Sequence, residues 1–555
     1  IQGNYTGLYI GGEGAQIFSG GLTNSGRILG GSNEAIEIDD TVTFTGGITN
    51  TSTGQIKSAS DTGIRIEADT FAGGIHNQGT IAGATNSING YGIHLTSDVT
   101  NFTGGITNSG LIEGNGGEGG DGINVEADVF GIPDVTGQGI HNTGTISGNE
   151  DGIDIESDTT TFNGGITNSG RILAASDQGI ETDAITFNGG INNSGTILAN
   201  DEGIDVEGTT FNGGIVNSGL IDSSGTGIDI DLPTFNGGVN NSGTIEADDD
   251  GIKVQGASGL NTFNNGITNS GLIRSLNEDG IDIEADDFFG GLTNSGTIIA
   301  DRSGIEIGED NGEIFSGGLT NSGSILAGST GIDIDLDDFN GGLTNSGLID
   351  ASTSRGINID ALTFDGGVTN SGTILGSSGI HIEVDTTFDG GVRNSGLIIA
   401  ASGTGIWIDP TTFNGGVTNT GTIIASGGEG SGDGIHLEGT TTFNGGFLNS
   451  GLINANGDDG AEAGPGGAGV YFDVTTFNGG FVNSGTILAD PDGTDQAGVV
   501  IYADTFNGGL TNSGLIDVQS GMGIFFQGKT FHNGIVNSGT IHVTDPGTGI
   551  RVFAN

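Results

Sequence analysis

The sequence predicts an all-β fold, a right-handed parallel β-helix (β-solenoid) of about 20 rungs with three short strands in each. Three observations support this prediction. One motif returns along the whole chain of 555 residues, apolar and polar residues alternate inside it, and glycine-rich corners separate the alternating segments. Alternation is typical of strands, and a fixed period is typical of stacked repeats.

The repeat is clearest at 161–174, which reads Thr-Phe-Asn-Gly-Gly-Ile-Thr-Asn-Ser-Gly-Arg-Ile-Leu-Ala and is soon followed by Gly179-Ile180. The shortest repeat is 24 residues, from Asn193 to Asn217. A repeat of this size cannot bury its apolar face alone, so the repeats must stack. At roughly 4.8 Å per rung, the stack would form a rod of roughly 95 Å.

Stacking places equivalent residues above one another and so predicts axial ladders. One ladder is aromatic, and we expect it to be broken only where Thr136 takes the place of Phe. Another is made of asparagine, whose amides can bond from one rung to the next. Representative ladder residues are Phe162, Phe187, Phe211 and Phe235, with Asn168, Asn193, Asn217 and Asn241.

The repeat predicts one continuous solenoid over 17–543, with an incomplete first rung at 1–16 and an incomplete last rung at 544–555. Gly-rich and acid-rich insertions interrupt the regular spacing, and we expect them to be loops on the solenoid edge. They lie near 113–121, 128–138, 454–468 and 490–497.

Neither end of the sequence resembles the polar cap that solenoids normally carry. Both ends stop at the same phase of the motif, which predicts head-to-tail stacking of copies. The alternative is that the chain is a piece of a longer polypeptide. The predicted stacking residues are Gly7, Leu8, Ile10, Ile550, Val552 and Phe553.

The charge balance is extreme, with 11 Lys and Arg against 69 Asp and Glu and a formal net charge of -58. Phosphate binding needs cationic side chains, so we expect neither nucleic acid nor an anionic membrane as a partner. No apolar run approaches a membrane span, so we expect no membrane insertion of this segment. The absence of cysteine excludes disulfides and is compatible with an extracellular protein.

Carboxylates occupy the outward positions of the Gly-Ile-x-Ile segment, where neighbouring rungs would place them about 5 Å apart. Like charges at this distance need screening, and Ca²⁺ prefers carboxylate ligands. The alternative is a solvated acidic face neutralised by ordinary salt. The candidate Ca²⁺ ligands are Asp154, Glu156, Asp205, Glu207, Asp229, Asp231, Asp282, Glu284, Asp333 and Asp335.

Catalysis has little support in the sequence. The seven histidines occupy scattered repeat positions without metal-ligand spacing, and acid pairs arise by chance in a chain this acidic. We therefore expect no enzyme and no catalytic residue, and Ca²⁺ is a candidate cofactor only.

The Asn-Ser-Gly-x-Ile and Gly-Gly-Ile-x-Asn repeats resemble the passenger regions of bacterial autotransporters and other large secreted adhesins, which are pectate-lyase-like β-helices. The resemblance covers essentially the whole chain. It implies secretion to the bacterial cell surface.

These observations together predict an extracellular structural protein that stacks with itself into a surface filament or matrix fibre, with lateral bundling. One alternative is an adhesin that binds polysaccharide or a host ligand. The other is a polysaccharide-active β-helix enzyme.

Overall fold

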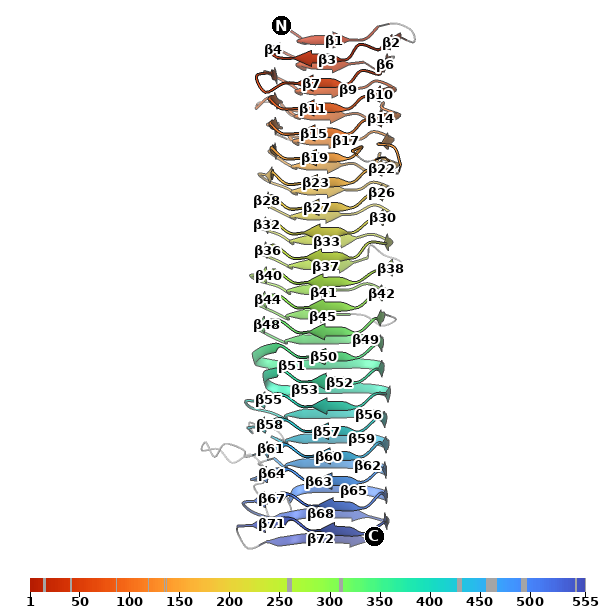
Figure 1. Cartoon of the computed structure of the whole chain (residues 1–555), viewed down its shortest axis with the longest axis vertical. Helices are drawn as coiled ribbons and strands as arrows, with labels where there is room; N and C mark the ends of the chain where they lie inside the picture. The colour runs from red at the N-terminus through yellow and green to blue at the C-terminus, as the bar shows by residue number, and fades with distance from the viewer. Residues whose placement is uncertain are drawn as a thin grey trace. The chain divides into compact units, whose positions relative to one another are not determined.

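The structure, a computed structural model, describes residues 1–12, 16–39, 42–85, 87–117, 119–133, 135, 137–256, 262–308, 313–426, 432–455, 467–490, 497–544 and 547–554. The chain divides into two compact units. Unit 1 comprises Ile1–Glu278 and Asp282–Asp287, and unit 2 comprises Asp279–Ile281 and Phe288–Asn555. No helix occurs in the described ranges, and within each unit parallel strands stack turn upon turn (Figure 1).

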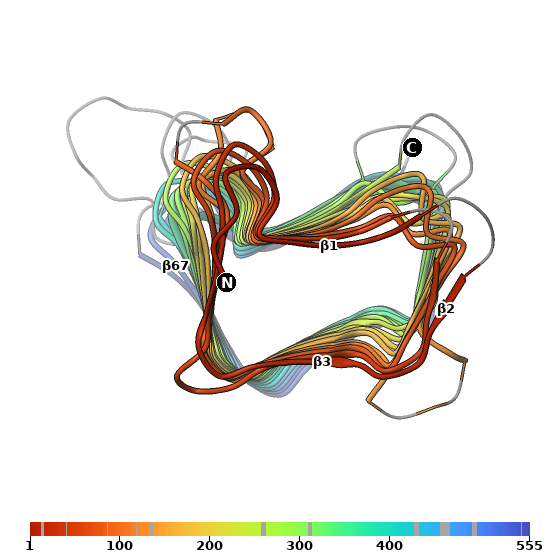
Figure 2. The ribbon, with the colours of Figure 1, turned by 90° about the horizontal axis from the view of Figure 1, so that it is seen from above.

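The fold is the predicted β-solenoid, with about 19 turns and about 26 residues between stacked strands. Seen from the N-terminal end, β1 (Leu8–Ile10), β2 (Gln16–Phe18) and β3 (Leu22–Asn24) follow one another clockwise and away from the viewer (Figure 2). The coil of unit 1 is therefore right-handed.

A typical turn of unit 1 has four short strands, one more than the sequence predicted. They are β21 (Ile153–Ile155), β22 (Thr161–Asn163), β23 (Ile166–Asn168) and β24 (Arg171–Ala174). The extra strand arises because the segment around Phe162 pairs separately with its equivalents, Phe130 and Phe187.

In unit 2, the first two strands of a turn often merge into one long strand. The merged strands are β49 (Ile332–Asn340), β56 (Ile406–Asn414), β59 (Ile435–Asn444), β62 (Val470–Asn478) and β65 (Ala497–Asn507). The still longer β51 (Leu348–Asp365) and β53 (Thr373–Phe388) also include the preceding strand.

Inward apolar side chains form the core of each unit. Ile153, Ile155 and Phe162 are fully buried, and the equivalent positions in unit 2, such as Ile332, Ile334 and Phe339, are too. Alternation therefore turns every second side chain of a strand into the core, as the period-2 pattern requires.

The predicted asparagine ladder is confirmed in both units. The Nδ2 of Asn168 donates to Oδ1 of Asn193 at 2.8 Å, and Asn193 repeats this contact with Asn217 at 2.9 Å. In unit 2, Asn294 donates to Asn321 at 2.8 Å. Each amide also donates to a carbonyl of the next turn, as Asn168 does to Thr196, so one side chain satisfies both the rung and its corner.

A second amide ladder follows the phenylalanines, and the repeat pattern alone did not predict it. Asn188 Nδ2 donates to Asn163 Oδ1 at 3.0 Å, and Asn212 donates to Asn188 at 3.0 Å. Its donors point toward the preceding turn, opposite to those of the first ladder. The asparagine that recurs in the Phe-Asn-Gly-Gly motif is the feature of the sequence that could have predicted it.

The phenylalanine ladder is confirmed, but its predicted break is wrong. Phe130 stacks between Phe102 and Phe162, with ring centroids 4.9 and 4.5 Å away. The inserted residues at 131–139 therefore follow the phenylalanine instead of replacing it. In unit 2 the stack changes to edge contacts between Phe364 and Phe388 and between Phe443 and Phe477.

The Gly-Gly corners need glycine because the backbone turns there with positive φ. Gly164 has φ of 95° and Gly165 has φ of 67°, and a Cβ on Gly165 would lie 2.4 Å from the carbonyl oxygen of Gly190. Backbones of successive turns thus approach closely at this corner.

The predicted insertions are described only in part. Residues 456–466, 491–496, 118, 134 and 136 lie outside the described residues. Both predicted partial rungs contain paired strands, since Leu8 is in register with Ile36 and Ile550 with Ile524.

Candidate cation-binding site

The outward residues of the Gly-Ile-x-Ile strands form one continuous line in unit 1. The strands that carry it are β17 (Ile123–Val125), β21, β25 (Ile180–Thr182), β29 (Ile204–Val206), β33 (Ile228–Asp231) and β37 (Ile252–Gln255). We call the line the acidic row. In direct backbone register, it consists of Asn124, Asp154, Glu181, Asp205, Asp229 and Lys253.

Three of the predicted Ca²⁺ ligands, Asp154, Asp205 and Asp229, therefore stand in adjacent or next-adjacent rungs of this row. Three more, Glu156, Glu207 and Asp231, lie two residues further along the chain, where Asp231 ends β33 and the other two directly follow β21 and β29. Glu181 belongs between Asp154 and Asp205 and was not among the predicted ligands. The Gly179-Ile180 pair before Glu181 marks the same position of the repeat in the sequence. The match is incomplete there, because Thr182 stands in place of the usual second Ile.

The carboxylates of the acidic row are buried although they point away from the core. Asp154 is 7% exposed and Asp205 is 8% exposed. The strand that carries them lies recessed between the two corners of each turn (Figure 2). Outward alternation alone would leave these carboxylates exposed to solvent. The corners on either side of the strand shield them instead.

The tightest cluster joins Asp121, Asp151 and Asp154. One carboxylate oxygen of each lies within 4.8 Å of the others, and all three residues are buried. Asp121 Oδ1 accepts a hydrogen bond from the backbone N–H of Asp151 at 3.2 Å. The backbone N–H of Gln178 donates to Asp151 Oδ1 at 2.8 Å, which holds the Asp151 carboxylate in place.

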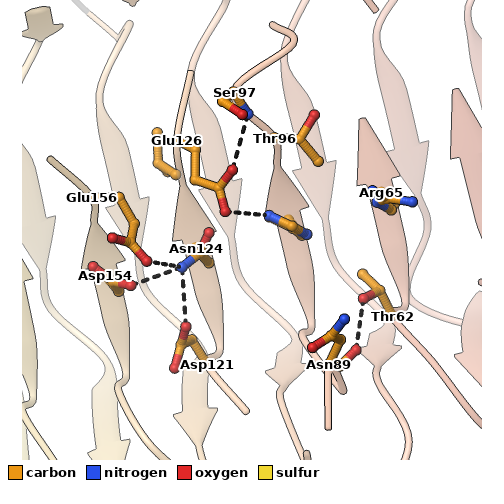
Figure 3. Close-up of polar contacts among 12 residues, drawn as sticks. Thr62, Arg65, Asn89, Thr96, Ser97, Asp121, Asn124, Glu126, Asp154 and Glu156 are labelled. Carbon is orange, nitrogen blue, oxygen red and sulfur yellow. Dashed lines mark hydrogen bonds and ion pairs between the residues drawn. The ribbon is translucent and has the colours of Figure 1, made fainter. Parts of the chain in front are cut away.

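Asn124 lies between two members of this cluster, Asp121 and Asp154 (Figure 3). Its Nδ2 donates to Asp154 Oδ2 at 2.7 Å, to Asp121 Oδ2 at 3.2 Å and to Glu156 Oε1 at 3.4 Å. The side chain is 1% exposed, yet its Oδ1 accepts no hydrogen bond. A buried oxygen without a hydrogen bond is energetically costly. Rotation of the Asn124 amide would exchange Oδ1 with Nδ2, and Oδ1 would then face Asp121 and Asp154 as a further cation ligand.

Burial shifts the proton affinity of the whole cluster. It raises the pKa of Asp121 to about 7. Burial, followed by repulsion from Asp121, raises the pKa of Asp151 to about 9 and that of Asp154 well above its usual range. A bound cation would remove this repulsion. An oxygen-only site with several carboxylates fits Ca²⁺, which accepts six to eight oxygen ligands.

Burial and neighbouring carboxylates also raise the pKa of other residues of the acidic row. Burial and the neighbouring Asp229 raise the pKa of Asp205 to about 9, and burial and Asp183 raise that of Glu181 to about 8. Between Asn142 and Lys253, Arg171 is the one cationic residue in the sequence, and it lies exposed on a different strand, β24. The chain thus supplies no counter-charge to this stretch of the row.

At Lys253 the chain itself supplies the cation that neutralises neighbouring carboxylates. Its Nζ lies 2.8 Å from Asp282 Oδ2, 2.8 Å from Glu284 Oε1 and 3.9 Å from Asp250 Oδ2. Burial alone would lower the pKa of Lys253, but its hydrogen bonds to Asp282 and Glu284 outweigh burial and raise it. The predicted ligands Asp282 and Glu284 therefore already hold an ammonium group.

An arginine plays a similar part on the equivalent strand two rungs before Asn124. Arg65 lies 2.5 Å from Glu67 and 3.7 Å from Glu34. His94 Nε2 lies 3.0 Å from Glu126, so the rung next to Asn124 is also paired (Figure 3).

The last predicted pair, Asp333 and Asp335, lies in unit 2. Asp333 Oδ1 accepts a hydrogen bond from Asn358 at 2.7 Å. Burial and then Asp360 raise the pKa of Asp335. These two residues have no equivalent of the Asp121 cluster around them in the described part of unit 2.

Two contributors to the site came from outside the predicted strand positions. Asp151 belongs to an acidic loop that the sequence places just before the strand, and Asp121 ends the insertion near 113–121. Their convergence depends on how these loops fold against the next rung, which spacing alone does not define.

Among the described residues, no helix is both long and apolar enough to cross a membrane. Comparison of the chain with protein-family models, with characterised proteins and with solved structures gave no match, so the site is defined by its own geometry.

Proposed function

We propose that the chain is an extracellular structural protein of the bacterial cell surface, a rigid solenoid that stacks head to tail into a filament or matrix fibre. The observation that carries the proposal is the continuity of its ladders within each unit. Backbone pairing, asparagine amides and core phenylalanines all repeat from turn to turn, as in Asn193 to Asn217 and Phe187 to Phe211.

Uniform turns favour a mechanical function. A catalytic site needs one rung to differ from its neighbours, whereas load-bearing needs every rung to be alike. Asn168, Asn193 and Asn217 are all fully buried and make the same contacts, so no rung among them is weaker than the next.

The predicted stacking residues lie in or next to β1 and β72 (Thr548–Ala554). β1 pairs with β5 (Ile36–Ile38) and β72 pairs with β68 (Met522–Gly528). Of the predicted stacking residues, Gly7, Leu8, Ile10 and Ile550 are partly buried, while Val552 is 48% and Phe553 39% exposed.

We propose further that divalent cations, Ca²⁺ first, bind at Asp121, Asp151 and Asp154 and screen the acidic row. With a net charge of -58, cation loading would also lower repulsion between copies and allow lateral bundling.

Electron microscopy of the purified chain with Ca²⁺ and with chelator tests the proposal. We expect fibres with Ca²⁺, and shorter or single particles with chelator. Single particles at every protein concentration in both conditions would overturn head-to-tail assembly.

A further inference from the structure

The line of outward residues changes its chemistry in unit 2. Where unit 1 carries carboxylates, four successive strands of unit 2 carry aromatic side chains in direct register, namely His381, Trp407, His436 and Tyr471. His381 stacks on Trp407 with ring centroids 4.0 Å apart, and His436 stacks on Tyr471 at 4.4 Å. Beyond them, Tyr471 packs against a small apolar cluster that contains Phe525.

A hollow of about 400 Å³ opens beside this aromatic line. Three of its lining side chains, Asp473, Tyr502 and Gln527, lie in direct register on successive strands. Asp504 lines it too, and small residues such as Gly528 form the wall. The hollow therefore combines two carboxylates, one amide and one aromatic ring.

Neighbouring rings hold Tyr502 at the hollow. Its ring is tilted by 57° to Tyr471, at a centroid distance of 5.9 Å, and by 65° to Phe525, at 5.5 Å. The side chain is half-buried, so part of the ring remains accessible. An aromatic ring beside carboxylates attracts cations, because the negative face of the ring adds to their charge.

The chain already makes both kinds of contact at the edges of the hollow. Lys529 Nζ lies 2.7 Å from Asp504 Oδ2. One turn beyond Gln527, the guanidinium carbon of Arg551 lies 4.3 Å from the ring centroid of Phe553. Ammonium and guanidinium groups thus fit the carboxylates and rings of this surface.

We infer that the hollow lined by Asp473, Tyr502, Asp504 and Gln527 binds a lysine or arginine side chain of a partner polypeptide. Charge complementarity selects this occupant, because a chain with net charge of -58 concentrates cations and repels anions. We assign the occupant to a different, basic polypeptide, because a second copy of this chain carries the same net charge of -58 and offers only 11 Lys and Arg against 69 Asp and Glu. Lys529 is 65% exposed and forms a surface pair, so a partner's cation can displace it.

Calorimetric titration with pentalysine tests the inference, with fully Nε-acetylated pentalysine as the neutral probe. We expect the wild type to bind pentalysine and to leave the acetylated peptide unbound. Asp473→Asn should weaken binding about tenfold. Tyr502→Leu should weaken it several-fold, whereas Tyr502→Phe, which keeps the aromatic face, should not.

Two further variants separate the hollow from general electrostatics. Asp517→Asn makes the same charge change at a partly exposed carboxylate that pairs with His542 elsewhere in unit 2, and it should leave binding unchanged. Lys529→Met removes the internal competitor and should strengthen binding about threefold. Equal losses in Asp517→Asn and Asp473→Asn would overturn the inference. So would equal binding of the acetylated peptide, which would favour a neutral ligand instead.

Discussion

Lys253 Nζ and Asp282 Oδ2 lie 2.8 Å apart, and the ammonium group is shared with Glu284 at the same distance. This contact neutralises the acidic row from within the chain. A few turns earlier, Asp121, Asp151 and Asp154 form a comparable group of carboxylates without a lysine or arginine. Both groups bring carboxylates close together, but only the group around Lys253 contains a cationic side chain that neutralises them.

Replacing Lys253 with Met should make unit 1 dependent on an added cation. The variant leaves Asp282 and Glu284 as uncompensated carboxylates, and the loss of one partner of a buried ion pair costs about 3 kcal/mol. We expect the unfolding free energy in chelator to fall by this order, and added Ca²⁺ to restore part of it. Thermal unfolding with and without Ca²⁺ measures both effects. A variant as stable as the wild type in chelator would contradict the compensating role of Lys253.

Ca²⁺ should raise the melting temperature of the wild-type chain, because it binds the folded cluster and not the unfolded chain. Asp154→Asn removes a buried ligand, so we expect it to reduce this increase by at least half. Asp222→Asn is the matched control, since it makes the same change at an exposed position of β32 (Leu220–Ser223). Equal Ca²⁺ responses in the two variants would place the binding elsewhere.

The repeat period and the alternation were sufficient to predict the solenoid and both main ladders. Each depends only on which residues recur, and Asn168 and Phe162 recur at fixed positions. The fourth strand was missed because a two- or three-residue segment around Phe162 has too few positions to show a period.

The site was predicted less completely than the fold. Asp154 and Asp205 were found from alternation, but alternation assigned them to an exposed face. Their burial comes from the recess between two corners, which is a property of the coil. Phe130 was left out of the predicted ladder because an insertion lengthens its spacing to Asn142, although the ring stays in the stack.

Without divalent cations, stability should fall as the pH rises from about 4 to about 9. Asp205 and Asp151 have pKa values of about 9 in the folded chain, against about 3.9 in an unfolded chain. Folding therefore takes up protons in this window, and the unfolding free energy decreases with each step in pH. We expect a higher melting temperature at pH 5 than at pH 8 in chelator.

Saturating Ca²⁺ should flatten this pH dependence, because a cation replaces the protons at the carboxylates. The measurement is a series of thermal unfolding curves at constant ionic strength. A melting temperature that rises with pH in chelator would contradict the prediction, because it would show that these carboxylates are ionised and stabilising in the folded chain.

Asn217→Ala should weaken the asparagine ladder more than the loss of one hydrogen bond. Its Nδ2 donates to Asn241 Oδ1 at 2.8 Å and to the carbonyl of Thr244 at 3.1 Å, and its Oδ1 accepts from Asn193 at 2.9 Å. The substitution removes these three contacts and the hydrogen bond that Asn217 Oδ1 accepts from the backbone N–H of Gly219 at 3.3 Å, so we expect a loss of about 3 kcal/mol. Ser218→Ala is the control, because Ser218 is exposed and makes only a long contact of 3.4 Å. Chemical denaturation measures both, and a loss below about 1 kcal/mol for Asn217→Ala would show that the ladder follows the fold without stabilising it.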